Sequence, residues 1–148
     1  MKVPLTLLAR TAMLGAVATT ASLALAAAPL PAVHDEGGVA YLSGGIGQRE
    51  SRAIEDAEKH WPRTLEFAQR EHGHGDFVAD VAVVVRGTGG RPARKATSDG
   101  PFLLAKLPPG RYTADATLDG KVLHHAVTVR RGVPTRALLV WPAGTDNG

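Results

Sequence analysis

The sequence predicts a mainly β domain, an antiparallel sandwich of seven strands preceded by a short strand and one α-helix. After Pro62, apolar and polar residues alternate in segments about ten residues apart, with turn-forming residues between them, which is typical of a sandwich. Asp119-Gly120 separates two such segments and is the strongest short-range signal for a β-hairpin. A helical period runs from about Gln48 to His60. These observations together favour a β-sandwich behind a single helix.

The N-terminal element is expected over residues 39–62. Val39 to Ser43 predict a short strand, which Gly44 to Gly47 break. The helix that follows carries a narrow apolar stripe formed by Ile54, Ala57 and Trp61, and Pro62 ends it. Residues 27–38 before this element are expected to be a linker.

The sandwich is expected over residues 63–142. Its strongest strand signal is Phe77 to Val85, whose odd-numbered residues predict one continuous apolar face. A weak, basic strand from Pro92 to Thr97 is expected at a sheet edge, where proline is tolerated. The other expected strands are Thr64–Ala68, Phe102–Leu107, Tyr112–Leu118, Lys121–Arg130 and Thr135–Trp141. Residues 143–148 are expected to form a disordered tail.

The first 26 residues predict a secretory signal peptide. Lys2 and Arg10 are the only charges before Asp35, and a stretch rich in alanine and leucine follows Arg10. Ala24-Leu25-Ala26 fits the small-residue cleavage pattern and makes Ala27 the first residue of the exported protein. The alternative is an uncleaved membrane anchor, although the segment is only weakly hydrophobic for that role. We therefore expect a periplasmic or secreted protein that meets the membrane only during export.

Charge and cysteine content narrow the function classes. The whole chain has 17 Lys+Arg and 14 Asp+Glu, and removing Lys2 and Arg10 leaves 15 against 14. This nearly neutral domain lacks the basic stripe with interleaved aromatic residues that binding to nucleic acid requires. No nucleic-acid partner is therefore expected. The chain has no cysteine, which excludes disulfides, a thiol nucleophile and a cysteine zinc site.

The segment from Ala79 to Val129 resembles the carboxypeptidase regulatory-like domain, a transthyretin-like (prealbumin-like) Greek-key sandwich. The matching features are a strand, a turn with glycine and proline, a Ser-Asp-Gly turn that leads into phenylalanine, and a Leu-Pro-Pro-Gly-Arg-Tyr corner. They are carried by Ala79–Val85, Gly89-Gly90-Arg91-Pro92, Thr97–Phe102, Leu107–Ala114, Asp119-Gly120 and Val127–Val129. The resemblance implies the fold, and it implies no single activity, because such modules are attached to unrelated proteins. The residues that would define its turns are Ser98, Asp99, Gly100, Pro108, Pro109, Gly110, Asp119 and Gly120.

The best metal candidates are His72 and His74, which flank Gly73 in a loop with Asp76 nearby. Two imidazoles at this spacing suit zinc, copper or nickel, and a convincing site needs a third ligand. The pair His124-His125 could supply it if the fold brings the segments together, and strand alternation predicts that the two rings face opposite ways. The interpretation without a metal, a solvated loop and one half-buried histidine, is favoured, so no metal or other cofactor is expected.

Catalysis has little support in the sequence. Gly44 to Gly47 lies between a strand and a helix, but Glu50 stands where a dinucleotide motif needs glycine, and its charge would repel a phosphate. No Gly-x-Ser-x-Gly elbow occurs, and the zinc carboxypeptidase His-x-x-Glu motif is absent. Glu55, Asp56 and Glu58 are expected on a solvated helix face. Trp61 and Trp141 are expected in the core or at its rim, and either would suit stacking on a sugar if it were exposed.

We therefore expect a non-catalytic, exported binding or structural module whose partner is a protein or carbohydrate at the cell envelope. The first alternative is a periplasmic metal-binding protein that uses the loop from His72 to His74. The second alternative is a small hydrolase on a transthyretin-like fold.

Overall fold

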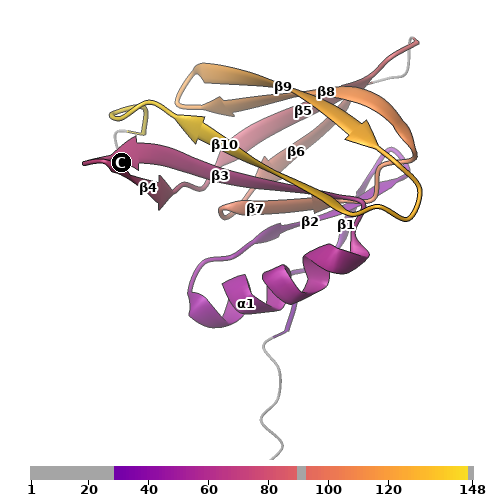
Figure 1. Ribbon diagram of the computed structural model, residues 1–148, viewed down its shortest axis with the longest axis horizontal. Helices are drawn as coiled ribbons and strands as arrows, with labels where there is room; N and C mark the ends of the chain where they lie inside the picture. The colour runs from indigo at the N-terminus through magenta and orange to yellow at the C-terminus, as the bar shows by residue number, and fades with distance from the viewer. Residues whose placement is uncertain (1–28, 90–92, 147–148) are drawn as a thin grey trace, which may run out of the picture.

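The computed structural model describes residues 29–89 and 93–146. Residues 1–28, which include the expected signal peptide, residues 90–92 and the last two residues lie outside the described ranges. The described residues form a mainly β structure with two sheets and one α-helix (Figure 1). The β-sandwich architecture expected from the sequence is thus present in its coarse form.

The first sheet, here called sheet A, contains six strands. Along its main path the order is β1-β2-β7-β3-β10, and β4 pairs with the far end of β3. Its strands are β1 (His34–Glu36), β2 (Val39–Gly44), β7 (Phe102–Ala105), β3 (Arg63–Glu71), β10 (Thr135–Trp141) and β4 (His74–Phe77).

The second sheet, sheet B, contains four strands in the order β6-β5-β8-β9. They are β6 (Arg94–Ser98), β5 (Val81–Gly87), β8 (Gly110–Leu118) and β9 (Lys121–Val129). The strand β6 lies at an edge, as its proline-preceded, basic sequence predicted. The Asp119-Gly120 hairpin is confirmed: Leu118 pairs with Lys121, and both turn residues have positive φ, 43° and 78°.

The expectation of seven antiparallel strands is wrong in two respects. The described residues contain ten strands. The short strand expected before the sandwich, β2, is part of sheet A, and two strands that were not expected, β1 and β4, also belong to sheet A. In addition, β10 pairs with β3 in parallel, with Thr135 opposite Arg63 and Trp141 opposite Gln69. Local alternation does not reveal strand direction, and this pairing joins segments that are about 70 residues apart in the chain.

The segment from Phe77 to Val85 was predicted as one strand, and this prediction is also wrong. The chain leaves sheet A after Phe77, turns at Asp80 with φ 57°, and enters sheet B at Val81. An aspartate tolerates this left-handed conformation better than most residues do. As a result Val81 and Val83 are buried between the sheets, while Phe77 is 60% exposed.

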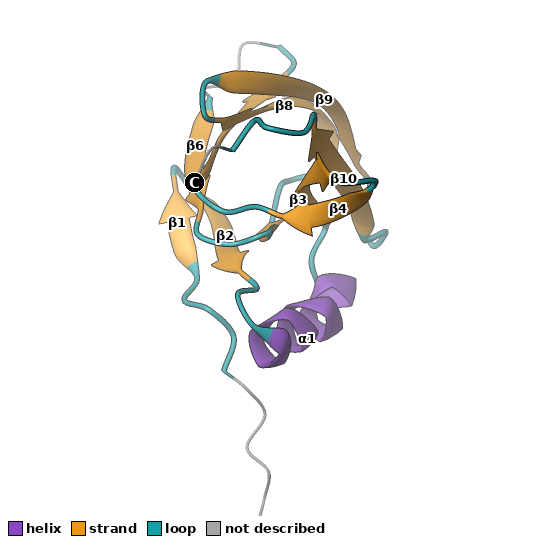
Figure 2. Cartoon of the chain, turned by 90° about the vertical axis from the view of Figure 1, so that its left-hand side faces the viewer, coloured by secondary structure: helices purple, strands orange, loops and turns teal. Residues whose placement is uncertain are grey.

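The helix is confirmed as α1 (Gln48–Ala57), extended by the 3-10 turn η1 (Glu58–His60). It packs on the outer face of sheet A, away from sheet B (Figure 2). Ile54 and Trp61 form a second core there with three sheet residues, Leu42, Phe102 and Leu104. The main core lies between the sheets and includes Phe67, Val81, Ala114, Ala116, Val127, Leu139 and Trp141.

The turns singled out in the sequence shape two corners of the sandwich. The hydroxyl of Ser98 donates to the carbonyls of Gly100 and Phe102, and the Asp99 amide donates to the Ser43 hydroxyl. Pro108, Pro109 and Gly110 lead into β8, and Tyr112 turns inward so that its hydroxyl donates to the Pro108 carbonyl at 2.6 Å. These contacts tie turns to strands, which is a structural role.

Candidate functional site

The predicted metal loop holds two separate histidine–carboxylate pairs. Nδ1 of His72 lies 3.2 Å from a Glu71 carboxylate oxygen, and Nε2 of His74 lies 3.3 Å from an Asp76 oxygen. Within residues 29–89 and 93–146, no group of three or more His, Asp or Glu side chains is placed to hold a metal ion. Of the two histidines considered as a third ligand, His125 contacts Arg63 and His124 contacts Asp115.

His124 and His125 point to opposite faces of sheet B, as strand alternation predicted. His125 faces the sandwich interior, where its Nε2 lies 2.8 Å from Nη2 of the buried Arg63. Arg63 also donates from Nη1 to the Thr135 hydroxyl at 2.9 Å. Burial lowers the pKa of Arg63. Burial also lowers the pKa of His125, and the positive charge of Arg63 lowers it further.

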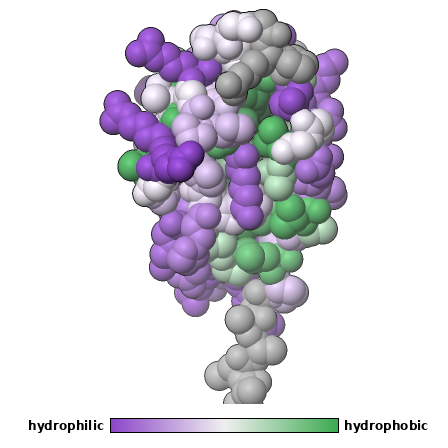
Figure 3. All heavy atoms as spheres, turned by 90° about the vertical axis from the view of Figure 1, so that its right-hand side faces the viewer, coloured by the Kyte–Doolittle hydropathy of each residue, from purple (hydrophilic) through white to green (hydrophobic). Residues whose placement is uncertain are grey.

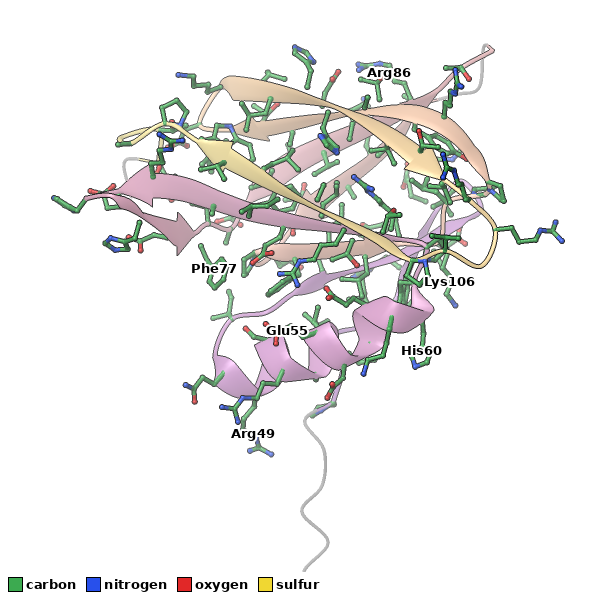
Figure 4. All side chains as sticks on the ribbon, viewed as in Figure 1. Arg49, Glu55, His60, Phe77, Arg86 and Lys106 are labelled. Carbon is green, nitrogen blue, oxygen red and sulfur yellow. The ribbon has the colours of Figure 1, made fainter. Side chains whose placement is uncertain are left out.

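The outer face of sheet B carries a second polar cluster. His124 and Arg86 both contact the carboxylate of Asp115, whose side chain is largely covered by them. Figure 4 shows Arg86 on the side of sheet B that faces away from sheet A. The hydrogen bond from His124 lowers the pKa of Asp115, and the Arg86 hydrogen bond adds to this effect. The cluster holds β5, β8 and β9 together on an open sheet surface.

The glycine-rich turn before α1 binds its own carboxylate. The Gly45 amide donates to Glu50 Oε1 at 2.7 Å, and the Ser51 hydroxyl donates to the Gly45 carbonyl at 2.6 Å. Glu50 therefore occupies the position where a phosphate would meet this helix N-terminus. The turn orients the helix rather than cradling an anion.

The acidic face of the helix was predicted to be solvated, and for Glu58 this prediction is wrong. Glu58 is half-buried, and its Oε1 accepts a hydrogen bond from Arg136 Nη1 at 3.2 Å. Arg136 also donates to Glu66 Oε2 from Nε at 3.0 Å and from Nη2. The hydrogen bond to Glu66 is the main cause that raises the pKa of Arg136. Local periodicity gave no sign of this network, since Arg136 lies 78 residues after Glu58.

A surface cleft of about 170 Å³ lies beside this network, between the helix and sheet A. It is lined by Glu55, Glu58, Lys59, Thr64, Pro134, Thr135 and Arg136. Two of its polar atoms are buried and have no hydrogen-bond partner among the described residues, namely Glu58 Oε2 and Thr64 Oγ1. Figure 4 shows Glu55 on α1 at the side of the helix that faces the strands. Both atoms have almost no exposed surface, so a molecule in the cleft would reach neither without a rearrangement of the lining.

An apolar strip adjoins the cleft on the same outer face of sheet A. We define it by Phe77, Leu138 and Val140, which are 60%, 56% and 37% exposed. Phe77 and Val140 both pair with the buried Ala68, one from β4 and the other from β10. Leu138 lies between Val140 and Arg136 on the outward side of β10, so the strip and the cleft form one continuous surface.

The opposite end of the molecule has a different character. Figure 3 shows that end with hydrophilic residues dominating and hydrophobic atoms confined to a smaller area. Figure 4 shows Phe77 at the other end, on the side of sheet A that carries α1. Both tryptophans are buried, Trp61 under the helix and Trp141 in the main core, so neither is available to stack on a sugar.

Within the part of the chain that is described, no helix is both long enough and apolar enough to cross a membrane. No known family model matches the chain, and the search of curated proteins finds no match. The cleft and the strip are the functional candidates that sequence reasoning missed. The only available signal was the run of outward-facing Arg136, Leu138 and Val140, where a solvated strand would carry polar residues.

Proposed function

We propose that this chain is a non-catalytic, exported binding module that docks a protein partner on the outer face of sheet A. The observation that carries the proposal is the apolar strip, where three large side chains remain exposed on the two strands that flank β3. Exposed apolar surface that is rimmed by charged residues is characteristic of protein–protein contacts. Here the charged rim is supplied by Arg136, whose side chain is 42% exposed and lies two residues before Leu138 on β10.

A protein partner fits this surface better than a glycan does. Both tryptophans are buried, and the one exposed aromatic ring of the strip, Phe77, has the aliphatic Val140 across β3. Leu138 and Val140 on β10 lie across β3 from Phe77 on β4. Together the three side chains form an apolar surface that suits the apolar side chains of a protein. Burial of these residues would supply the favourable free energy of association.

The proposal includes the family and the compartment suggested by the sequence. We propose that residues 63–142 are a transthyretin-like module of the carboxypeptidase regulatory-like type, that residues 1–26 are the signal peptide that exports it, and that it acts in the periplasm or outside the cell. The Ser98–Gly100 and Pro108–Tyr112 corners support the family proposal, because each joins a turn to a strand as the resemblance implies.

The proposal is tested by placing a photo-reactive amino acid at position 138 or, as a control, at position 122. Leu138 and Val122 are both exposed aliphatic residues on edge strands, but Val122 lies on the outer face of sheet B. Illumination of the source cells should yield a protein adduct of defined mass from position 138 and no such adduct from position 122. The same adduct from both positions, an adduct with a second copy of this chain, or no adduct would overturn the proposal.

A further inference from the structure

We infer that the docked partner adds an extended, apolar segment to the open edge of β10, as a new strand of sheet A. This inference rests on the proposed function, because it states how the partner binds at the same surface. It is carried by the hydrogen-bonding pattern of β10, by the character of the other edge strands and by the residues beside the open edge.

The strand β10 has a hydrogen-bonded neighbour on one side only. It lies at the end of sheet A, and among the described strands it pairs with β3 alone. A strand at the edge of a sheet presents a row of unpaired main-chain N–H and C=O groups to an incoming strand. The side of β10 that faces away from β3 has this character over the seven residues of the strand.

The main-chain groups that point to the open edge can be identified from one hydrogen bond. The Thr135 amide donates to the Pro62 carbonyl at 3.1 Å, so the main-chain groups of Thr135 point toward β3. In a parallel pair, every second residue of a strand bonds to the same neighbour. The residues in between, Arg136, Leu138 and Val140, therefore direct their N–H and C=O groups to the open edge.

The other edge strands have features that discourage strand addition, namely short length and charged residues. β1 and β4 are only three and four residues long. β6 begins with Arg94-Lys95, and β9 begins with Lys121. The sequence of β10 contains no lysine, proline or acidic residue, and its one charged side chain, Arg136, is bound by Glu66 and Glu58. β10 is thus the long edge that lacks such protection.

The space beside this edge is partly open to solvent. Figure 2 shows β9, an edge strand of sheet B, on the same side of the sandwich as β10. Leu123 on β9 and Ala137 on β10 pack against the main core, and yet both are only partly buried. An added strand would cover these two residues with one face and extend the surface of Leu138 and Val140 with the other. Both faces of the occupant are therefore apolar, as in a buried strand.

The test uses the full chain labelled with ¹⁵N and a probe peptide of alternating valine and threonine, with a lysine at each end and both termini blocked. In the chain alone, the Leu138 and Val140 amides should exchange with solvent at least about tenfold faster than the Leu139 amide, which points toward β3. The probe should slow this exchange saturably. The same peptide with N-methylated backbone amides keeps its side chains but cannot donate to the ladder, so it should have no effect.

Two variants at position 140 separate the main chain from the side chain. Val140→Pro removes an N–H at the open edge and leaves the bonds to β3 intact, because proline is tolerated where the N–H faces solvent. Val140→Ala keeps this N–H and shortens the side chain. We expect Val140→Pro to weaken probe binding by about tenfold or more, and Val140→Ala by about threefold or less.

Equally slow exchange of all three amides in the chain alone, no slowing by the probe, or equal slowing by the N-methylated peptide would each overturn the inference. Slowing that grows with the concentration of the chain alone would also overturn it, because the occupant would then be a second copy. Equal affinities of the two Val140 variants would show that the main chain is not used. The exchange measurements use the unmodified chain, so they decide the inference even if Val140→Pro does not fold.

The probe needs no partner, so this test is independent of cross-linking at position 138. A partner captured at position 138, together with an edge that ignores the probe, would leave the proposed function standing and remove strand addition. Probe binding without any captured partner would remove the proposed function instead.

Discussion

Nη2 of Arg63 lies 2.8 Å from Nε2 of His125, and together they bridge the first residue of β3 and the middle of β9. A guanidinium only donates hydrogen bonds, so Nε2 of His125 must accept, and the ring proton is placed on Nδ1. The contact therefore selects neutral His125. It also stabilises the buried cation of Arg63, which forms no ion pair with a carboxylate of the described residues.

The first prediction concerns stability against pH. Because the pKa of His125 is lowered in the folded state, the unfolded state binds more protons at and below its ordinary pKa of 6.5. The free energy of unfolding should thus fall as the pH is lowered from about 7.5 to 5.5. Urea denaturation at several pH values measures this dependence.

Two variants separate His125 from the other histidines. His125→Gln cannot gain a proton and should flatten the dependence, whereas His72→Gln, at an exposed loop position, should retain it. The lowered pKa of Asp115 acts in a different window, since its stabilisation is lost only as the pH falls below about 4. An unchanged slope in His125→Gln would show that His125 is not the group responsible.

The second prediction concerns the Ser98–Gly100 corner. A Cβ at Gly100 would lie 2.3 Å from the carbonyl oxygen of Gly44, so Gly100→Ala forces two backbone segments apart. We expect a destabilisation of about 1–3 kcal/mol, as for other overpacked sites. The midpoint of chemical denaturation reports it.

Gly75→Ala is the control for this substitution. A Cβ at Gly75 would meet only the Ala68 Cβ, at 3.7 Å, which is an ordinary contact, and its backbone is not in the left-handed region. This variant should be neutral or slightly stabilising. If both alanine variants unfold at the same denaturant concentration, the close approach of Gly100 to Gly44 does not limit the fold.

The third prediction concerns export. If residues 1–26 are a signal peptide, the exported protein begins at Ala27. Mass spectrometry of the intact protein from the cell envelope and the medium measures this directly. A protein that retains Met1 and fractionates with membranes would instead support the uncleaved anchor.

The sequence predicted most local elements because their signals are local. Alternation in Tyr112 to Leu118, the Asp119-Gly120 turn and the helical stripe at Ile54 each depend on neighbouring residues, and the structure confirms all three. The break at Asp80 was missed because a left-handed aspartate leaves no mark in a run of valines and alanines. The parallel pairing of β10 with β3 was missed because strand direction depends on distant segments.

The candidate site was less predictable for the same reason. Glu58, Glu66 and Arg136 lie on three elements, and only the fold joins them into one network. The exposed strip likewise depends on β4 and β10 lying on opposite sides of Ala68. The histidine loop was conspicuous in the sequence, but the structure gives its histidines separate carboxylate partners.

The central claim, that a protein docks on the outer face of sheet A, is tested most directly by the affinity of the partner captured at position 138. Its dissociation constant is to be compared between the unmodified chain, Leu138→Ser and Val122→Ser. Loss of one buried leucine should raise the constant by about tenfold or more in Leu138→Ser. Val122→Ser, whose side chain is 43% exposed on the other sheet, should leave it within about twofold. Equal constants for the two variants would contradict the account.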